Sequence, residues 1–332
     1  MSGTGRTAAI LGCLGPELSA DEAAFFREAD PFGFILFARN VESPQQLRRL
    51  TGDLRAAVGR EAPVLVDQEG GRVQRLRAPH WREWTPPLEA VATARDPARA
   101  MWLRARLIAH ELRGVGIDCN CAPTADVARE ATHPFLKNRL YGADPETVSQ
   151  ISMAVAEGLM AGGVLPVVKH LPGHGLARVD SHKDLPRVTE TRADLDRIDF
   201  APFRALNHLP MAMTAHLVFE AIDPDRPATQ SPAMIEVIRR DIGFQGLLMT
   251  DDLSMQALSG SHGQRTAAAM AAGCDLALHC NGKDEEMAEV VAAAGIQSPA
   301  TRARAEAALA ARRAPDPVDI GALEAELRHL ME

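Results

Sequence analysis

The sequence predicts an α/β fold in which eight parallel strands close into a single (β/α)₈ barrel of the TIM type. Short apolar runs alternate with segments of helical periodicity, and each run is continuous, as expected of strands covered on both faces. A length of 332 residues with 46% apolar side chains suits one such barrel. The structural alternative, a doubly wound open sheet, would normally carry a GxGxxG turn after an early strand, and the sequence has none.

The predicted strands follow one another at intervals along the chain. They comprise residues 7–12, 33–37, 63–67, 116–122, 165–169, 211–216, 247–251 and 275–280. The segment Ile10–Cys13 loosely resembles a lipoprotein cleavage site, but its apolar run of about six residues is shorter than the roughly 7–15 of a signal core. We therefore expect a first strand there. No run approaches the roughly 20 apolar residues of a membrane span.

Four intervening helices carry clear start and stop signals. One begins at Ser43-Pro44, with Gln46 in the capping-box position. The others are expected over 97–113, from Asp144-Pro145 to the Gly162-Gly163 pair, and from Ser231-Pro232 to Gly243. An Ala/Arg-rich segment from about residue 295 predicts a further helix that packs on the barrel. We expect one catalytic domain over residues 1–332.

The composition argues against some classes of binding partner and indicates the make-up of the core. A formal net charge of −8 argues against a protein that binds nucleic acid or anionic membranes through a basic face. The five cysteines are odd in number and form no CxxC, which favours a reducing compartment and a packing role for Cys119 and Cys121. With only 4% aromatic residues, the core must consist mainly of Ala, Leu, Val, Ile and Met.

Polar and ionisable side chains gather where the predicted strands end. Because the active site of such a barrel lies at the carboxyl ends of its strands, these groups predict one common site. They are Asp67 to Arg72 after the third strand, Asn138 to Gly142 after the fourth, Lys169 and His170 at the fifth, His216 at the sixth, Asp251 and Asp252 at the seventh, and Cys280 and Asn281 at the eighth.

The loop from 170 to 190 carries three histidines and Asp180. An ionised Asp180 that accepts from one ring nitrogen of His182 would fix the tautomer and raise the basicity of the other nitrogen. Taken alone, the two residues are better explained as a surface aspartate and a surface histidine separated by a serine.

Several blocks of sequence together resemble glycoside hydrolase family 3, in particular the β-N-acetylhexosaminidases of bacterial peptidoglycan recycling. The blocks are Val66–Arg75, Lys169–Gly175 followed by Asp180-Ser181-His182, Thr250–Met255, and Gly273–Asp275 followed by Cys280-Asn281. They span residues 66 to 281 in family order. In larger members that resemble this chain in the barrel, the acid/base comes from a second domain; we expect no such domain here and expect the barrel to supply the group.

The resemblance implies roles for matching positions. Asp251 would be the nucleophile, His182 the general acid/base, and Asp180 its partner. The terminal N-acetylglucosamine would be held by Asp67, Arg75, Arg139, Lys169 and His170. The family pattern has a small polar residue after the arginine, whereas this chain has Leu140. This departure slightly weakens the assignment of Arg139. Asp252 is expected to cap the next turn, and His174 and His216 to position their neighbours.

The implied mechanism is retaining hydrolysis through a covalent glycosyl-enzyme intermediate. An imidazole with an ordinary pKa of about 6.5 can donate a proton to the leaving group and then accept one from water near neutral pH. The implied substrate is N-acetylglucosamine linked to 1,6-anhydro-N-acetylmuramic acid, with or without peptide, in a bacterial cytoplasm. We expect no metal ion, no cofactor, no nucleic-acid or membrane partner, and a monomer.

Three alternatives remain at the level of sequence. The histidines and aspartates also suit a metal-dependent barrel hydrolase, although no HxH pair ends the first strand. A different sugar specificity, such as that of a β-glucosidase, is a second alternative, which the Asp-Ser-His loop disfavours by resemblance. A non-catalytic sugar-binding protein on a decayed barrel is the third, and the intact set Asp251, Asp180 and His182 opposes it.

Overall fold

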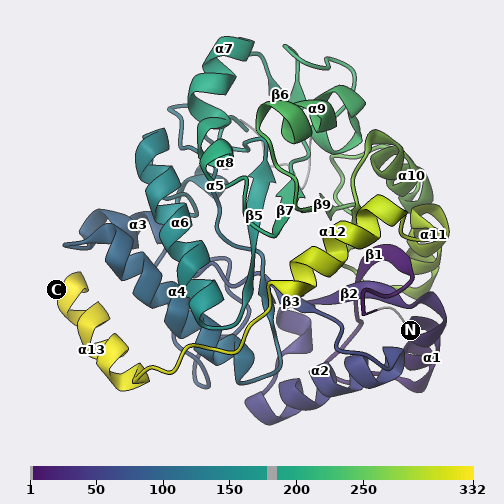
Figure 1. The fold of residues 1–332 in the computed structure, drawn as a ribbon, viewed down its shortest axis with the longest axis horizontal. Helices are drawn as coiled ribbons and strands as arrows, with labels where there is room; N and C mark the ends of the chain where they lie inside the picture. The colour runs from purple at the N-terminus through teal and green to yellow at the C-terminus, as the bar shows by residue number, and fades with distance from the viewer. Residues whose placement is uncertain (1–2, 178–184) are drawn as a thin grey trace.

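The structure, a computed structural model, describes residues 3–177 and 185–332. Its centre is a closed barrel of parallel strands in the order β1–β10–β9–β7–β5–β4–β3–β2, surrounded by helices (Figure 1). The barrel strands are β1 (Thr7–Gly12), β2 (Pro31–Leu36), β3 (Val64–Val66), β4 (Cys119–Asn120), β5 (Leu165–Leu171), β7 (Met211–Thr214), β9 (Leu247–Asp252) and β10 (Leu276–His279). The predicted (β/α)₈ barrel is confirmed.

Helices connect successive strands on the outside of the barrel. The α-helices are α1 (Ala20–Ala29), α2 (Pro44–Val58), α3 (Pro87–Thr93), α4 (Pro97–Arg113), α5 (Pro134–Lys137), α6 (Pro145–Ala161), α7 (Arg192–Asp194), α8 (Ala201–Ala205), α9 (Pro232–Glu236), α10 (His262–Ala272), α11 (Asp284–Ala294), α12 (Pro299–Ala310) and α13 (Ile320–Met331). Short 3₁₀ turns occur at η1 (Ala38–Asn40) and η3 (Ala228–Gln230), and π turns at η2 (Leu195–Asp199) and η4 (Val237–Asp241).

The helix signals in the sequence operate as expected. In α2 the Ser43 hydroxyl accepts from the Gln46 backbone N–H, and the Gln46 side chain accepts in return from the Ser43 N–H. These two bonds satisfy N–H groups that the first turn of a helix leaves without partners. The helix expected from Ser231 divides into α9 and the π turn η4, and Gly243 follows with a positive φ of 82°.

Strand β4 is shorter than the predicted segment 116–122 because side chains replace part of its backbone ladder. The Val64 N–H donates to the Asp118 carboxylate at 2.8 Å, and the Gln68 N–H donates to the Asn120 side-chain oxygen at 2.9 Å. Such bonds join the segment to β3 without the regular pairing that defines a strand. A second feature that the sequence did not predict is a two-stranded parallel sheet of β6 (Arg187–Val188) and β8 (Val218–Phe219).

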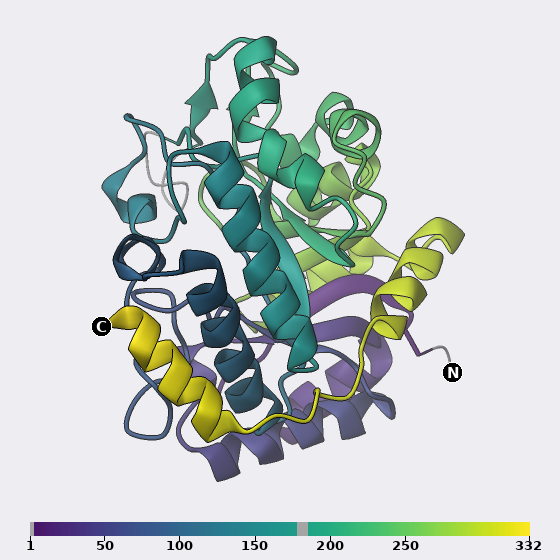
Figure 2. The same cartoon turned by 60° about the vertical axis from the view of Figure 1, so that its left-hand side comes forward.

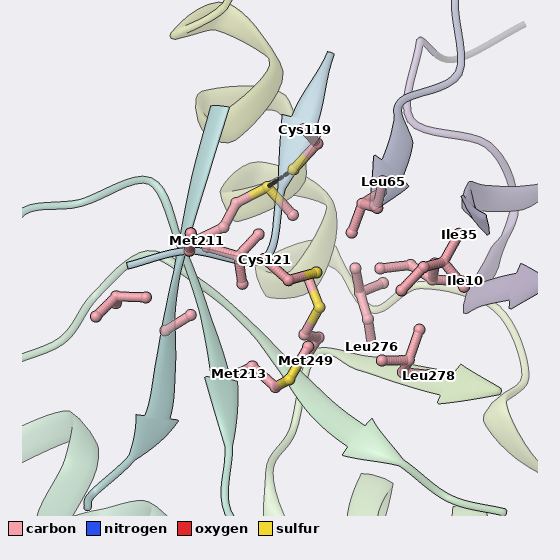
Figure 3. Packing of buried hydrophobic residues seen from close by; sticks show 14 of the residues in the cluster. Ile10, Ile35, Leu65, Cys119, Cys121, Met211, Met213, Met249, Leu276 and Leu278 are labelled. Atoms are coloured by element: carbon pink, nitrogen blue, oxygen red, sulfur yellow. Dashed lines mark hydrogen bonds between the residues drawn. The ribbon is translucent and has the colours of Figure 1, made fainter. Parts of the chain in front are cut away.

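The barrel interior is filled by aliphatic and sulfur-containing side chains. Figure 3 shows Met211 of β7 beside Cys119 and Met249 of β9 beside Cys121, with Met213 of β7 next to Met249. The sulfur atoms of Cys119 and Met211 lie 3.9 Å apart. Flexible thioethers can fill the irregular space that a core poor in aromatic residues leaves. The predicted packing role of the two cysteines agrees with their complete burial.

The C-terminal segment runs across the barrel and ends against α4. Figure 2 shows α13 lying beside α4, and the Arg95 N–H donates to the Leu330 carbonyl at 2.9 Å. Arg99 adds a two-bond ion pair with Glu326 at 2.7 and 2.8 Å. In the described part of the chain, no helix is both long enough and apolar enough to cross a membrane.

Candidate active site

A cleft of about 230 Å³ opens at the carboxyl ends of the barrel strands. Its walls combine charged groups with a few apolar side chains. It is lined by Ile35, Phe37, Asp67, Arg72, Val73, Arg75, Phe135, Arg139, Lys169, His170, His174, Met213, Asp251, Asp252, Met255, Leu278 and Cys280. A concave site with several convergent ionisable groups is the usual form of a site that binds a small polar molecule.

One wall of the cleft is an ion-pair network built around Lys169 on β5. Its ammonium lies 2.7 Å from an oxygen of Asp67 and 2.7 Å from an oxygen of Glu69. Glu69 also accepts two bonds from Arg139, at 2.9 and 2.8 Å, in the bidentate geometry that suits a guanidinium. Arg75 donates to the second Asp67 oxygen at 3.1 Å. Three cations therefore face two carboxylates in this wall.

The network keeps its carboxylates ionised. Burial alone would raise the pKa of Asp67, but the charges of Lys169 and Arg75 outweigh it and hold that pKa well below its usual range. For Glu69, burial acts upward as well, and Arg139 and Lys169 nevertheless lower the pKa to about 2. Both residues are therefore acceptors at neutral pH, and the wall has a fixed pattern of charge.

Asp251 lies near the end of β9 and lines the same cleft. One of its oxygens accepts from the Asp252 backbone N–H at 2.8 Å. Burial alone would raise the pKa of Asp251, but the imidazoles of His216 and His170 oppose this and the pKa lies below its usual range. An ionised carboxylate at a strand end is a rigidly placed nucleophile or hydrogen-bond acceptor.

Asp252 has the capping role that the sequence suggested. Its carboxylate accepts from the Ser254 N–H at 3.0 Å, from the Ser254 hydroxyl at 2.6 Å and from the Cys280 N–H at 3.2 Å. These bonds join the turn after β9 to the end of β10. The position of Asp251, one residue earlier, is thereby fixed.

His170 belongs to a buried dyad with Asp126. Its Nδ1 lies 2.7 Å from one oxygen of Asp126, whose other oxygen accepts from the backbone N–H groups of His170 and His174. Burial acts to raise the pKa of Asp126, but His170 and these hydrogen bonds lower it. An ionised Asp126 makes Nδ1 the protonated nitrogen of His170 and leaves Nε2 as the second hydrogen-bonding atom of the ring.

Two further histidines surround the site as neutral rings. Burial lowers the pKa of His174 to about 3, and its ring lies edge-on to that of His170 at 5.1 Å between centroids. Burial also lowers the pKa of His216, whose ring contacts Thr229 at 2.8 Å and the Asp252 carbonyl at 3.1 Å. Both contacts agree with the positioning role that the sequence suggested for His216.

Among the described residues, Asp126 and the cleft residues His170 and His174 form the one group at this site whose ligand atoms lie close enough together to hold a metal ion. The 2.7 Å between Asp126 and His170 is a hydrogen-bond distance. Two ligands of a tetrahedral zinc ion, each about 2.0–2.1 Å from the metal, would be about 3.3 Å apart. The geometry of this pair therefore favours a positioned histidine over a metal ligand set.

Six of the eight predicted site residues line the same cleft: Asp67, Arg75, Arg139, Lys169, His170 and Asp251. Asp180 and His182 lie outside the described residues. Two carboxylates hold the cationic and histidine side chains in place: Glu69, which sequence reasoning placed at a strand end but gave no role, and Asp126, which it missed. Both residues follow the carboxyl end of a barrel strand, and this position in the sequence could have indicated that they belong to the site.

A family model described as the glycosyl hydrolase family 3 N terminal domain matches residues 15–310. The chain belongs to glycosyl hydrolase family 3. A β-hexosaminidase of Alkalilimnicola ehrlichii is 41% identical over 282 residues, which cover 82% of this chain and 80% of that protein. The prediction of a family 3 β-N-acetylhexosaminidase is thereby confirmed at the level of family and enzyme class.

Solved structures of family 3 proteins share the whole barrel. NagZ from Neisseria gonorrhoeae superposes with a TM-score of 0.84 at 28% identity, over 100% of this chain and 97% of that one. A family 3 β-N-acetylglucosaminidase from Paenibacillus sp. str. FPU-7 gives a TM-score of 0.84 at 33% identity, over 94% of this chain. The matched region makes up 62% of that larger protein.

Proposed function

We propose that this family 3 enzyme removes terminal β-linked N-acetylglucosamine from peptidoglycan turnover fragments, with retention of configuration. Asp251 is the proposed nucleophile and forms a covalent glycosyl-enzyme intermediate. The observation that carries the proposal is the cleft itself, which an ionised Asp251 lines together with the Asp67–Lys169 pair. A carboxylate beside a fixed set of donors and acceptors is what attack on a bound sugar requires.

The sugar-binding roles follow from the charges of the cleft. Asp67 accepts from sugar hydroxyl groups, while Lys169, Arg75 and Arg139 donate to hydroxyl or acyl oxygens. His170 offers Nε2, because Asp126 occupies its Nδ1. Each of these residues also stabilises a neighbour through an ion pair or hydrogen bond, so that the pocket is already ordered before substrate binds.

His182 is the proposed general acid/base, with Asp180 as its partner. Both assignments rest on the resemblance of the Asp180-Ser181-His182 motif to the family. The histidine would protonate the departing oxygen and then remove a proton from the incoming water. A histidine base carries no negative charge when neutral, so an anionic acceptor such as phosphate is compatible with it.

The proposed substrate is N-acetylglucosamine linked to 1,6-anhydro-N-acetylmuramic acid, with or without peptide, which places the enzyme in cell-wall recycling in a bacterial cytoplasm. NagZ from Neisseria gonorrhoeae matches this chain over its full length. All five cysteines are buried free thiols, which suits a reducing compartment. We propose that it acts as a monomer and needs no cofactor.

The first experiment compares hydrolysis of p-nitrophenyl β-N-acetylglucosaminide by wild type, Asp251→Ala and His182→Ala. We expect kcat to fall about 10³-fold or more for Asp251→Ala and about 10²–10⁴-fold for His182→Ala. Asp225→Ala and His208→Ala, both at exposed positions, are the matched controls and should retain wild-type turnover. An unchanged His182→Ala enzyme would move the acid/base role to another group, and His170 would be tested next.

A second experiment addresses mechanism and substrate. The anomeric form of the first product, followed by proton NMR, should be β for a retaining enzyme, and an α product would overturn the covalent intermediate. The anhydro-disaccharide, with and without peptide, is then compared with chitobiose. A higher kcat/KM for the anhydro-disaccharide supports the peptidoglycan substrate, whereas turnover of chitobiose alone contradicts it.

A further inference from the structure

We propose that His262, His279 and Glu286 form a binding site for a transition metal ion of the Zn²⁺ type, outside the catalytic cleft. The three residues come from three elements. His262 begins α10, His279 ends β10, and Glu286 lies in the first turn of α11. Helices α10 and α11 lie side by side on the outside of the barrel (Figure 1).

The direction of His279 separates this cluster from the catalytic cleft. Its two chain neighbours, Leu278 and Cys280, both line the cleft. Because successive side chains of a strand point to opposite faces, His279 points away from the cleft and toward the surrounding helices. The imidazoles of His262 and His279 meet there edge to face, with 5.2 Å between ring centroids.

The spacing of the ligand atoms is close to that of a tetrahedral site. One oxygen of Glu286 lies 3.5 Å from Nε2 of His279 and 3.8 Å from Nε2 of His262. Ligands about 2.0–2.1 Å from a tetrahedral zinc ion are about 3.3–3.4 Å apart. The three ligand atoms all lie within 4.8 Å of one another, so side-chain movements would bring them onto one ion. His262 and Glu286 are each about one-fifth exposed (23% and 21% of the side chain), so that water can reach a fourth position.

His279 supplies an independent indication of a ligand. Its side chain is 0% exposed, and neither ring nitrogen has a hydrogen-bond partner among the described residues. A buried polar group without a partner destabilises the folded protein. The ring faces two other metal-binding side chains, and a bound ion would satisfy the nitrogen directed toward them.

Two neighbouring side chains hold the carboxylate of Glu286 in place. Asn281 donates to Glu286 at 3.2 Å and Lys283 at 3.0 Å, and these two contacts orient the carboxylate.

A bound ion would join three elements beside the active site. Cys280 follows His279 directly and donates its N–H to Asp252 at 3.2 Å, next to the proposed nucleophile. The ion would thus attach the first turns of α10 and α11 to the end of β10. We assign it a stabilising role and no part in the hydrolytic reaction.

The test is titration of the chelator-treated full-length protein with Zn²⁺, by competition with a chromogenic chelator. His262→Ala and Glu286→Gln should each weaken one zinc-binding event about tenfold or more, while His208→Ala and Glu285→Gln leave it unchanged. In parallel, Zn²⁺ should raise the Tm of wild type more than that of the two ligand variants, because binding to the folded state alone stabilises it. Tm measured in chelator shows that the variants are folded.

Anomalous diffraction at the zinc edge distinguishes this cluster from the histidines of the cleft. A peak between His262, His279 and Glu286 supports the proposal. A peak confined to the cleft, an ordered water molecule in place of the ion, or ligand variants with wild-type affinity would each overturn it. These readouts do not depend on hexosaminidase activity.

Discussion

At the scale of single residues, the active-site cleft is organised by carboxylates that the substrate does not need to contact. Glu69 holds Arg139 and Lys169, and Asp126 holds His170 through Nδ1. Each acidic group is buried and paired, so its removal would leave a cation or an imidazole without its partner. Such residues determine the geometry of the site because they fix the side chains that face the sugar.

Replacing Glu69 with Gln should therefore destabilise the protein strongly. Loss of the carboxylate charge removes the ion-pair partner of the buried Arg139 and one of the two ion pairs of Lys169, and breaking a buried ion pair costs about 3–5 kcal/mol. The matched control is Glu83→Gln, which breaks the exposed pair with Arg77 and should cost at most about 1 kcal/mol. Urea unfolding at neutral pH measures both. Equal losses in the two variants would contradict the role given to Glu69.

The same residue gives a prediction for pH. The pKa of Glu69 is lowered to about 2 in the folded protein, whereas an unfolded glutamate has an ordinary pKa of 4.5. Its stabilising contribution is therefore complete above the ordinary pKa and is lost as the pH falls from about 4.5 toward 2. The difference in unfolding free energy between wild type and Glu69→Gln should shrink over this interval. A difference that stays constant down to pH 3 would be inconsistent with an ionised, paired Glu69.

At the scale of elements, the contact between α4 and α6 depends on a glycine. A Cβ at Gly158 would lie 2.4 Å from the Trp102 carbonyl oxygen and 2.9 Å from the Cβ of Ala105. The two helices can approach this closely only because α6 has no side chain at this point. Gly52 in α2 is the converse case, since a Cβ there meets nothing within 4 Å.

These two glycines form a matched pair of substitutions. Alanine favours a helix over glycine by about 0.5–1 kcal/mol, so Gly52→Ala should stabilise the protein by about that amount. Gly158→Ala has the same intrinsic gain but forces α4 and α6 apart, and should destabilise by about 1–3 kcal/mol. Chemical denaturation of both variants gives the comparison. Stabilisation by both substitutions would show that the helix contact adjusts without cost.

At the scale of the whole molecule, the sequence predicts most clearly what depends on local pattern. The continuous apolar runs located all eight barrel strands, and Ser43 with Gln46 marked the beginning of α2. The strand-end rule predicts that Asp67, Lys169 and Asp251 share one cleft, because the parallel strands of a barrel end on one side, and all three line it.

Features that depend on pairing between distant residues were not predictable in this way. Glu69 and Arg139 are 70 residues apart, and Asp126 and His170 are 44 apart. No periodicity in the sequence relates them, and only the closed barrel brings them together. The His262, His279 and Glu286 cluster is of the same kind, since it depends on the packing of α10 against α11.

The interior of the barrel allows a final prediction on how the whole molecule is held together. Met249 is fully buried in the sulfur-rich core shown in Figure 3, and it does not line the cleft. Met249→Ala removes buried apolar atoms and leaves a cavity, so the free energy of unfolding should fall by about 2–5 kcal/mol. Met249→Leu conserves the volume and should cost less than about 1.5 kcal/mol.

Chemical denaturation measures the two losses in stability. The activity per folded molecule should remain near that of wild type in both variants, because neither substitution changes the charged wall of the cleft. If Met249→Ala instead abolishes activity while the protein stays folded, the core must determine the positions of the strand ends, and the site would then depend on interior packing as well as on its own ion pairs.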